Sequence, residues 1–418
     1  MEIATEGGRL LLDLGMPLPD RNGSSTMRQQ NWVQDDGSEE MALLPPIAGL
    51  RGESSEKIAA LVISHAHQDH YGLALFVPPD TPIYATTGTR ALMKASRIFL
   101  PHAAATPDPT GLPKSTPVQI GPFKVTATLV DHSAPDAAML LVEAERKRIL
   151  YSGDLRAHGR KARLFDRLIE KPPADIDYLL LEGTTLGRGS QEMPNETAVE
   201  QALVERLANR KNLVLLFCSS QNLDRLVSVY RAAKRTDSTL VIDLYTAYLL
   251  KSLTCISARL PQHNWPGIRV KYWKHHADCL VRAGEERFLY EVVGSRIQLD
   301  EIVDKREKVL VLARSSSLLT HILRRLPTLD GLQLIWSMWS GYLTGEDPAS
   351  QLSRDTGIAL QQIHTSGHAG VEDLRRLATA IHPRRLIPIH TSAPEQFSAL
   401  FDNVLPLQDG QWIDCDLA

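Results

Sequence analysis

The chain has 418 residues, of which 43% are hydrophobic and 23% are charged, and its formal net charge is −3. This composition excludes general disorder, and the length favours two domains because it exceeds what one hydrophobic core usually sustains. The acidic balance argues against a protein that holds nucleic acid by bulk charge alone, although a local groove and bound cations could still supply a positive field.

The four cysteines are scattered along the chain and form no CxxC pair. This spacing argues against both a disulfide framework and a thiolate zinc site. No apolar run reaches membrane-spanning length, and the first residues lack the basic and apolar regions of a signal peptide. We therefore expect a cytoplasmic protein that has reduced thiols and no membrane partner.

The amino-terminal part predicts β-strands. Residues 2–5 and 9–13 flank Gly7-Gly8, which is typical of a hairpin. Because the first residue already lies inside a strand, we expect a second copy or a partner protein to complete this edge of the sheet. Residues 20–56 are polar and rich in Gly and Ser, which predicts a long surface loop. Further strands are predicted at 59–63, 123–130, 138–143, 148–152 and 178–182.

Strands and helices alternate after residue 187. A helix is predicted at 196–207, and apolar strands are predicted at 213–217, 240–243, 309–313 and 332–336. This alternation favours a doubly wound parallel sheet. A strand, a helix and a strand then follow at 358–364, 371–381 and 385–389. We therefore expect an inserted α/β domain at 188–351 within a domain formed by 1–187 and 352–418.

The segment Ser64-His65-Ala66-His67-Gln68-Asp69-His70 is the strongest indication of chemistry in the chain. It places three imidazoles and a carboxylate directly after an apolar strand. These ligands suit zinc and, to a lesser degree, manganese or iron. The alternative is a solvated loop that is rich in histidine, but the whole chain holds only 14 histidines. We interpret the segment as part of a metal site.

Other candidate ligands follow later strands. Asp131-His132 follows the strand at 123–130, Asp154 follows the strand at 148–152, and His390 closes the strand at 385–389. The carboxyl ends of strands are where open α/β sheets place their sites. Each residue alone would more often be structural, but together with the histidine cluster they predict a two-metal site.

These residues resemble the signature of the metallo-β-lactamase superfamily, which implies an α/β fold of the αββα sandwich type. The signature runs through seven positions: His65, His67, Asp69, His70, His132, Asp154 and His390. The resemblance implies that the first two histidines of the cluster and His132 hold one divalent metal ion. It also implies that the last two residues of the cluster and His390 hold a second ion, and that Asp154 bridges both. Zinc is the expected metal, with manganese as the alternative.

Three further motifs resemble the β-CASP branch of this superfamily, whose nucleases carry an inserted domain. The motifs are Leu181-Glu182-Gly183-Thr184-Thr185, His364-Thr365-Ser366-Gly367-His368-Ala369 and Pro388-Ile389-His390. The segments at 364–369 and 386–391 are most similar to the ribonuclease J family. In this branch, a histidine in the third motif goes with RNA-processing members, whereas DNA-repair members carry valine. The resemblance implies a β-CASP-type insertion and a ribonuclease that acts on single-stranded RNA.

The expected chemistry is hydrolysis of a phosphodiester by a water that two cations activate, since such a pair also stabilises the charge of an in-line displacement. Asp69 and Asp154 are expected to be catalytic as well as ligands, with Asp154 orienting the nucleophile. Glu182 is expected to hydrogen-bond a neighbouring ligand histidine, with an exposed loop carboxylate as the alternative. His368 is the candidate general acid.

The segment around Ser366-Gly367 is a candidate phosphate site. It offers a hydroxyl and backbone N–H groups between His364 and His368, and the helix predicted from Val371 would add its dipole. A plain turn is the alternative, and His364 could instead be a structural partner.

Three other sets of residues have open roles. One set could line a nucleic-acid path or form a solvated face: Arg156, Arg160, Lys161 and Arg163. Another could stack bases, although core packing is the favoured role: Trp336, Trp339 and Tyr342. A third matches no motif position and is expected at the surface: His102, His275 and His276.

A ribonuclease is the leading hypothesis, and three alternatives stay open. The first is a small-molecule hydrolase of a cyclic nucleotide, thioester or lactone, which would not need a second domain to close over its substrate. The second is a DNA nuclease on the same fold. The third is a binding protein without metals, which the complete set of candidate ligands disfavours.

Overall fold

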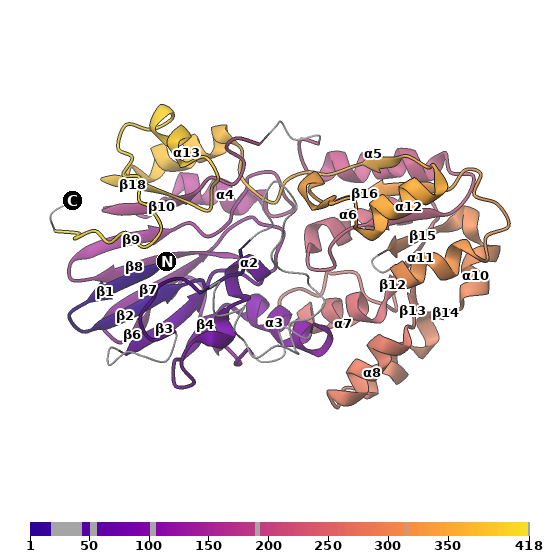
Figure 1. Cartoon of the computed structure of the whole chain (residues 1–418), viewed down its shortest axis with the longest axis horizontal. Helices are drawn as coiled ribbons and strands as arrows, with labels where there is room; N and C mark the ends of the chain where they lie inside the picture. Colours follow the sequence, from indigo (N-terminus) through magenta and orange to yellow (C-terminus); the bar gives the residue numbers. More distant parts are fainter. Residues whose placement is uncertain (18–43, 51–56, 101–105, 189–192, 314–315, 417–418) are drawn as a thin grey trace. The chain divides into compact units, whose positions relative to one another are not determined.

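The structure is a computed structural model that describes every residue except 18–43, 51–56, 101–105, 189–192, 314–315 and 417–418. The described residues form two compact units (Figure 1). The first unit holds the described residues before 189 and those from Gly367 onward, and the second holds the residues between 193 and Ser366. Most of the loop predicted at 20–56 and the predicted surface residue His102 lie outside the described residues. Among the helices that are described, none is long and apolar enough to cross a membrane.

Two sheets form the centre of the first unit. The first sheet has the order β1-β2-β3-β4-β5, and only its β1–β2 pair is antiparallel. Its strands are β1 (Glu2–Thr5), β2 (Gly8–Leu12), β3 (Ile58–Ile63), β4 (Ile83–Ala85) and β5 (Thr110–Gly111). The second sheet has the order β18-β10-β9-β8-β7-β6, and its parallel pairs are β18–β10 and β10–β9. Its strands are β6 (Val118–Ile120), β7 (Phe123–Leu129), β8 (Ala138–Ala144), β9 (Lys147–Tyr151), β10 (Tyr178–Glu182) and β18 (Arg385–Ile389).

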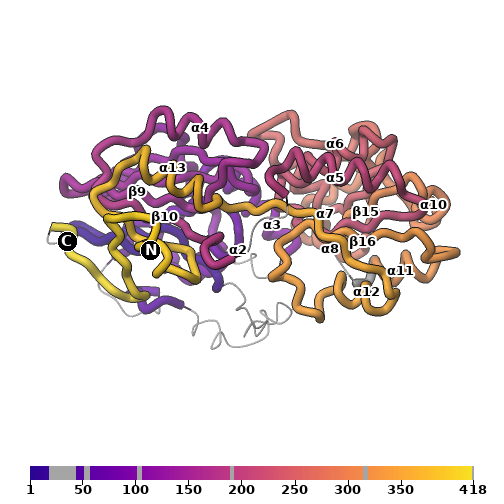
Figure 2. The backbone as a smooth tube through the Cα atoms, turned by 90° about the horizontal axis from the view of Figure 1, so that it is seen from above, coloured from indigo at the N-terminus to yellow at the C-terminus, as the bar shows by residue number. Residues whose placement is uncertain are grey.

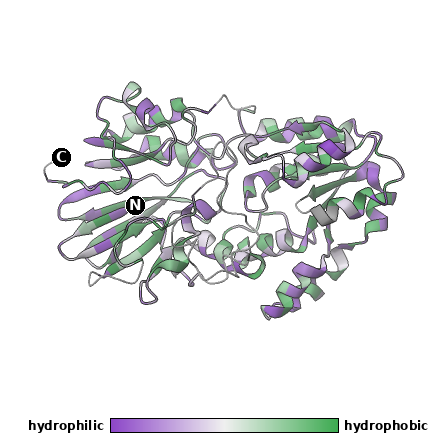
Figure 3. Cartoon of the chain, viewed as in Figure 1, coloured by the Kyte–Doolittle hydropathy of each residue, from purple (hydrophilic) through white to green (hydrophobic). Residues whose placement is uncertain are grey.

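The two sheets of the first unit pack face to face. Alternate residues of β7, including Phe123 and Val125, point into one apolar cluster with Leu10 and Val62 of the first sheet. The helices α2 (Gln68–Tyr71) and α3 (Thr87–Phe99) belong to the part of the chain that forms the first sheet. The hydrophobic strands stand out against the polar connections in Figure 3.

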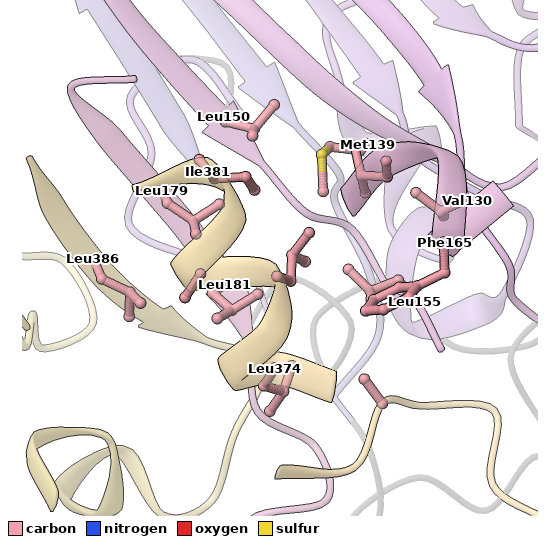
Figure 4. Close-up of a cluster of buried hydrophobic side chains, with 14 of the residues drawn as sticks. Val130, Met139, Leu150, Leu155, Phe165, Leu179, Leu181, Leu374, Ile381 and Leu386 are labelled. Carbon is pink, nitrogen blue, oxygen red and sulfur yellow. The ribbon is translucent and has the colours of Figure 1, made fainter. Parts of the chain in front are cut away.

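Two helices cover the outer face of the second sheet. Figures 1 and 2 show α4 (Ala162–Glu170) and α13 (Val371–Ile381) side by side. Phe165 of α4 and Leu374 of α13 pack on Leu179 and Leu181 of β10 in a second apolar cluster (Figure 4). Each such side chain contributes roughly 1.5–3 kcal/mol by its burial. The first unit is therefore an αββα sandwich, which confirms the fold expected from the sequence.

The second unit is a doubly wound α/β domain, as predicted. Its sheet has the order β14-β13-β12-β15-β11-β16-β17, and every strand pair is parallel. The strands are β11 (Val214–Phe217), β12 (Thr239–Asp243), β13 (Ile268–Lys271), β14 (Arg296–Ile297), β15 (Val309–Ala313), β16 (Gln333–Trp336) and β17 (Leu360–Gln362). The helices are α5 (Glu196–Ala208), α6 (Leu223–Arg235), α7 (Leu244–Ser252), α8 (Lys274–Arg282), α9 (Arg287–Glu291), α10 (Leu299–Asp304), α11 (Ser316–Leu323) and α12 (Pro348–Thr356).

The inserted unit extends further than the boundary expected at residue 351. Helix α12 and strand β17 belong to the second unit, because β17 pairs with β16 and Leu352 packs in the apolar cluster of that unit. The chain returns to the first unit only at Gly367, within the motif at 364–369.

Candidate metal centre

The histidine cluster forms the loop after β3 and continues into α2, which contains Asp69 and His70. Backbone hydrogen bonds hold this loop against residues 14–16, because Leu14 N donates to His70 O at 2.8 Å and Met16 N donates to Gln68 O at 3.0 Å. A Cβ atom on Gly15 would lie 1.6 Å from Asp69 O, so only glycine allows the two segments to lie this close. The loop that carries the ligands is therefore fixed by its backbone.

Three histidines form a first ligand group: His65, His67 and His132. The Nδ1 atom of His67 lies 3.1 Å from Nε2 of His65 and 3.2 Å from Nε2 of His132. Ligand nitrogens around a tetrahedral zinc ion would lie about 3.4 Å apart, given Zn–N bonds of about 2.0–2.1 Å. The three nitrogens therefore fit one cation of zinc size.

A second ligand group contains two carboxylates and two histidines: Asp69, His70, Asp154 and His390. The Nε2 atom of His70 lies 3.1 Å from Asp154 Oδ2, and Nε2 of His390 lies 3.5 Å from Asp69 Oδ2. This mixed imidazole and carboxylate set suits zinc or manganese.

Asp154 lies between the two ligand groups. Its Oδ2 atom is 3.6 Å from His65 Nε2 in the first group and 3.1 Å from His70 Nε2 in the second. Both Asp154 oxygens and His70 Nε2 are buried, and no described residue offers any of them a hydrogen bond of acceptable geometry. Buried charged oxygens without such a partner are costly unless a cation coordinates them. The residues present therefore fit divalent metal binding.

The two groups hold protons differently when no metal is bound. Burial lowers the pKa of His67 to about 4, so this imidazole is in the neutral form that binds metal. Burial also opposes the proton on His390, but the Asp154 and Asp69 carboxylates together outweigh it and raise the pKa of His390 to about 9. In the same way, Asp154 and Asp13 outweigh burial and raise the pKa of His70. A cation in the second group would therefore replace protons.

Hydrogen bonds at Nδ1 orient three of the candidate ligand histidines. Nδ1 of His70 lies 2.7 Å from Asp13 Oδ2, and Nδ1 of His132 lies 2.7 Å from Gly367 O. Nδ1 of His390 lies 2.7 Å from the hydroxyl of Thr184. Because an acceptor on Nδ1 fixes the proton there, these contacts leave Nε2 of His70 and His132 for metal.

Sequence reasoning missed Asp13 and Thr184. Asp13 ends a run of three buried leucines and has a φ of 54°, the left-handed region that is uncommon for residues other than glycine. A carboxylate in that position, two residues before Gly15, is the one local feature that could have pointed to it. Thr184 belongs to the motif at 181–185, but nothing in that motif singled out its hydroxyl as a partner of His390.

Glu182 and His368 form a pair beside the second ligand group. Both are in a cluster with Asp154 and His390, and Glu182 Oε2 lies 3.0 Å from His368 Nδ1. Glu182 is buried at the end of β10, and its other oxygen accepts a hydrogen bond from Leu155 N at 2.8 Å. The partner of Glu182 is thus the candidate general acid rather than one of the seven expected ligands.

The expected phosphate residues are divided between the units. Gly367 and His368 lie beside the ligands of the first unit, where the Gly367 carbonyl accepts from His132. His364 and Ser366 belong to the second unit, where Nδ1 of His364 lies 3.4 Å from the guanidinium of Arg225.

Burial and contacts decide between several of the roles that the sequence left open for basic, aromatic and histidine residues. Arg156 is fully buried and faces Asp131 at 3.7 Å, so it cannot line an exposed path, whereas Arg163 is exposed. Trp336 is buried in the apolar cluster of the second unit, and Tyr342 is exposed. His275 is exposed and His276 is partly buried, 3.8 Å from Asp243, and neither joins a ligand group of the described residues.

Two family patterns match the chain. The beta-lactamase superfamily domain matches residues 17–214, and the Zn-dependent metallo-hydrolase RNA specificity domain matches residues 358–401. With the αββα sandwich and its paired ligand groups, these matches support a metallo-β-lactamase protein of the β-CASP type that is similar to ribonuclease J.

The similarity to ribonuclease J extends over much of the chain. The chain is 24% identical to "Ribonuclease J" of Mycolicibacterium smegmatis over 368 residues, which cover 83% of this chain and 61% of that protein. It is 27% identical to "Ribonuclease J" of Sinorhizobium meliloti over 205 residues, which cover 46% of this chain and 35% of that protein. The matches thus span between about a third and three fifths of these relatives.

A solved structure shares the whole fold. A protein of unknown function from Enterococcus faecalis V583 superposes with a TM-score of 0.72 at 21% identity, and the match covers 98% of this chain and 95% of that one. At this identity the likeness concerns the fold alone.

Proposed function

We propose that this protein hydrolyses phosphodiester bonds in RNA with two divalent metal ions, zinc in the first instance and manganese as the alternative. The observation that carries the proposal is the position of Asp154, whose buried oxygens lie between two ligand groups. Bound cations supply a nucleophile at neutral pH and neutralise the charge that develops on phosphate oxygens. The RNA specificity domain at 358–401 and the similarity to ribonuclease J support RNA as the substrate.

In this proposal each ligand group holds one cation, and the carboxylate of Asp154 reaches both. His65, His67 and His132 bind through neutral imidazoles that burial already keeps free of a second proton. Asp69, His70 and His390 form the second site together with Asp154. The carboxylates of Asp69 and Asp154 also orient the attacking water.

His368 is the proposed general acid, and Glu182 positions it. The Glu182 carboxylate lies 3.0 Å from Nδ1 of His368, so it fixes the orientation of the ring. Nε2 of His368 can then give its proton to the leaving oxygen of the RNA. His364, Ser366 and Gly367 belong to the same segment of chain and are proposed to bind the phosphate.

Metal analysis combined with cleavage assays tests this function. We expect about two metal ions per chain and metal-dependent cleavage of labelled single-stranded RNA. His368→Ala should keep its metal and lower kcat by about 10²–10⁴-fold, the usual effect of losing a general acid. His382→Asn is the matched control, because His382 is an exposed histidine of the same unit with a left-handed backbone that asparagine tolerates.

Single-stranded DNA and a small phosphodiester serve as competing substrates in the same assay. Preferential cleavage of DNA would show that DNA, and not RNA, is the substrate. A fully metal-loaded protein that cleaves only the small phosphodiester would overturn the nuclease proposal.

A further inference from the structure

Arg225 of α6 is a buried cation that the expected chemistry leaves unexplained. Its side chain has no exposed surface, and it forms a two-pronged ion pair with Glu196 of α5, at 3.2 Å from Nε and 3.0 Å from Nη2. Glu196 is itself fixed, because the hydroxyl of Ser228 donates to its Oε2 atom at 2.7 Å. The charge of the guanidinium is therefore compensated inside the second unit.

The remaining donors of Arg225 reach Ser337, directly after β16, and the segment that follows β17. Nη1 donates to the carbonyl and the hydroxyl of Ser337 at 2.7 and 2.6 Å, and Nη2 donates to the carbonyl of Thr365 at 3.2 Å. Nη1 also lies 3.4 Å from Nδ1 of His364. One buried side chain thus holds both the backbone of the motif at 364–369 and the ring of its first histidine.

This contact determines which nitrogen of His364 carries the proton. A guanidinium has donors only, and it does not lose its proton in proteins. Nη1 has two N–H groups for three neighbouring acceptors, so Nδ1 of His364 shares one of them with Ser337, and a proton on Nδ1 would set two donors against each other. A neutral imidazole has one N–H, so His364 carries its proton on Nε2.

We propose that Arg225 is a positioning residue that holds His364 in the Nε2–H form, as a fixed hydrogen-bond donor to a phosphate oxygen of bound RNA. The phosphate role of His364 rests on the proposed function, whereas the position of its proton does not. The Glu196 partner keeps the guanidinium paired, so the arrangement persists in the metal-free protein without RNA.

Nitrogen NMR of histidine-labelled, metal-free protein tests the position of the proton directly. We expect the resonances of His364, assigned with a His364→Ala variant, to show protonated Nε2 and unprotonated Nδ1 in the wild type. In Arg225→Lys, which keeps the charge but loses the planar fork, the Nδ1–H form should become populated. A wild-type His364 that is protonated on Nδ1 would overturn the proposal, whether or not any variant folds.

RNA cleavage tests the consequence for binding. Arg225→Lys should raise KM by about tenfold with little change in kcat, since the lost hydrogen bond is to a charged phosphate in both the ground state and the transition state. The matched control is Arg235→Lys, because Arg235 also extends from α6 to a glutamate of α5, Glu200, but is about half exposed.

The two assays separate the possible failures. Absence of RNA cleavage by the wild type would reject the proposed function. The NMR result on the position of the His364 proton would still stand, because it does not depend on cleavage. The expected proton position with an unchanged KM in Arg225→Lys would reject the role in phosphate binding, while the nuclease proposal would stand.

Discussion

The Nδ1 atom of His70 lies 2.7 Å from the Oδ2 atom of Asp13, a residue 57 positions earlier in the chain. Asp13 also accepts hydrogen bonds from the hydroxyl of Tyr151 at 2.8 Å and from the backbone and hydroxyl of Ser64 at 2.6 Å each. One carboxylate thus connects the end of β2, the start of the histidine loop and β9. It holds the His70 ring so that Nε2 faces the other ligands.

Replacement of this carboxylate should weaken metal binding without removing a ligand. We expect Asp13→Asn to reduce the affinity of the second metal site by about 10–100-fold, the usual effect of losing a hydrogen-bond partner of a ligand histidine. Competition with a chromogenic chelator measures the affinity of each site. Asp80→Asn, at an exposed aspartate of the same unit, should leave both sites unchanged. Equal affinities in Asp13→Asn and wild type would show that Asp13 does not orient His70.

The close approach of Gly15 to the backbone of Asp69 leads to a second prediction about the same loop. Since a Cβ atom there would lie 1.6 Å from Asp69 O, Gly15→Ala must displace the segment that carries the ligands. We expect metal content to fall and the free energy of unfolding to decrease by about 1–3 kcal/mol, as for other overpacked positions. Gly294→Ala is the control, because nothing lies within 4 Å of a Cβ atom at that position. Full metal occupancy and unchanged stability in Gly15→Ala would contradict this account of the loop.

The sequence could indicate the candidate ligands because each one lies beside a strong local pattern. His65 follows an apolar strand directly, and His132, Asp154 and His390 each close or follow a strand. Strand ends are visible from hydrophobic patterning, so polar residues at those ends can be found without a structure. The alternation of strands and helices likewise predicted the parallel sheet of the second unit.

Partners that are distant in sequence were not predictable in the same way. The carboxylate of Asp13 meets His70 and Tyr151 only after the two sheets pack, and nothing near residue 13 specifies those contacts. Arg156 opens a basic run that looks solvated, yet it is buried against Asp131. The end of the insertion was placed too early because β17 is short and only partly buried, so its membership of the second sheet leaves little trace in the sequence.

Metal removal should destabilise the first unit selectively, because all candidate ligands of the described residues belong to it. Each unit has its own apolar clusters, so calorimetry should resolve one metal-sensitive and one metal-insensitive transition. At a metal concentration about 100-fold above Kd, binding stabilises the folded unit by about 2.7 kcal/mol, or roughly 5–10 °C in Tm for a unit of this size. A chelator that shifts both transitions equally would contradict the assignment of the ligands to one unit.

Metal binding should release protons at neutral pH. His390 has a pKa of about 9 in the metal-free protein, so below pH 9 it holds a proton that a cation must displace. Metal affinity in the second group should therefore rise with pH as the pH approaches about 9. Titration calorimetry in two buffers of different ionisation enthalpy measures the protons released. Release should be larger at pH 7 than at pH 10, because His390 has lost its proton at pH 10, and release that does not depend on pH would contradict the raised pKa of His390.

If Glu182 acts through proton transfer by His368, the effect of replacing it should depend on the leaving group of the substrate. An RNA phosphodiester has a poor leaving oxygen that needs a proton, whereas a p-nitrophenyl phosphodiester releases a stable anion without one. Glu182→Gln removes the carboxylate that orients His368 through Nδ1 but can keep the hydrogen bond from Leu155 N. We expect kcat on RNA to fall by about 10–100-fold and kcat on the p-nitrophenyl ester to change little. An equal loss on both substrates would mean that Glu182 acts on the metal ligands and not through proton transfer by His368.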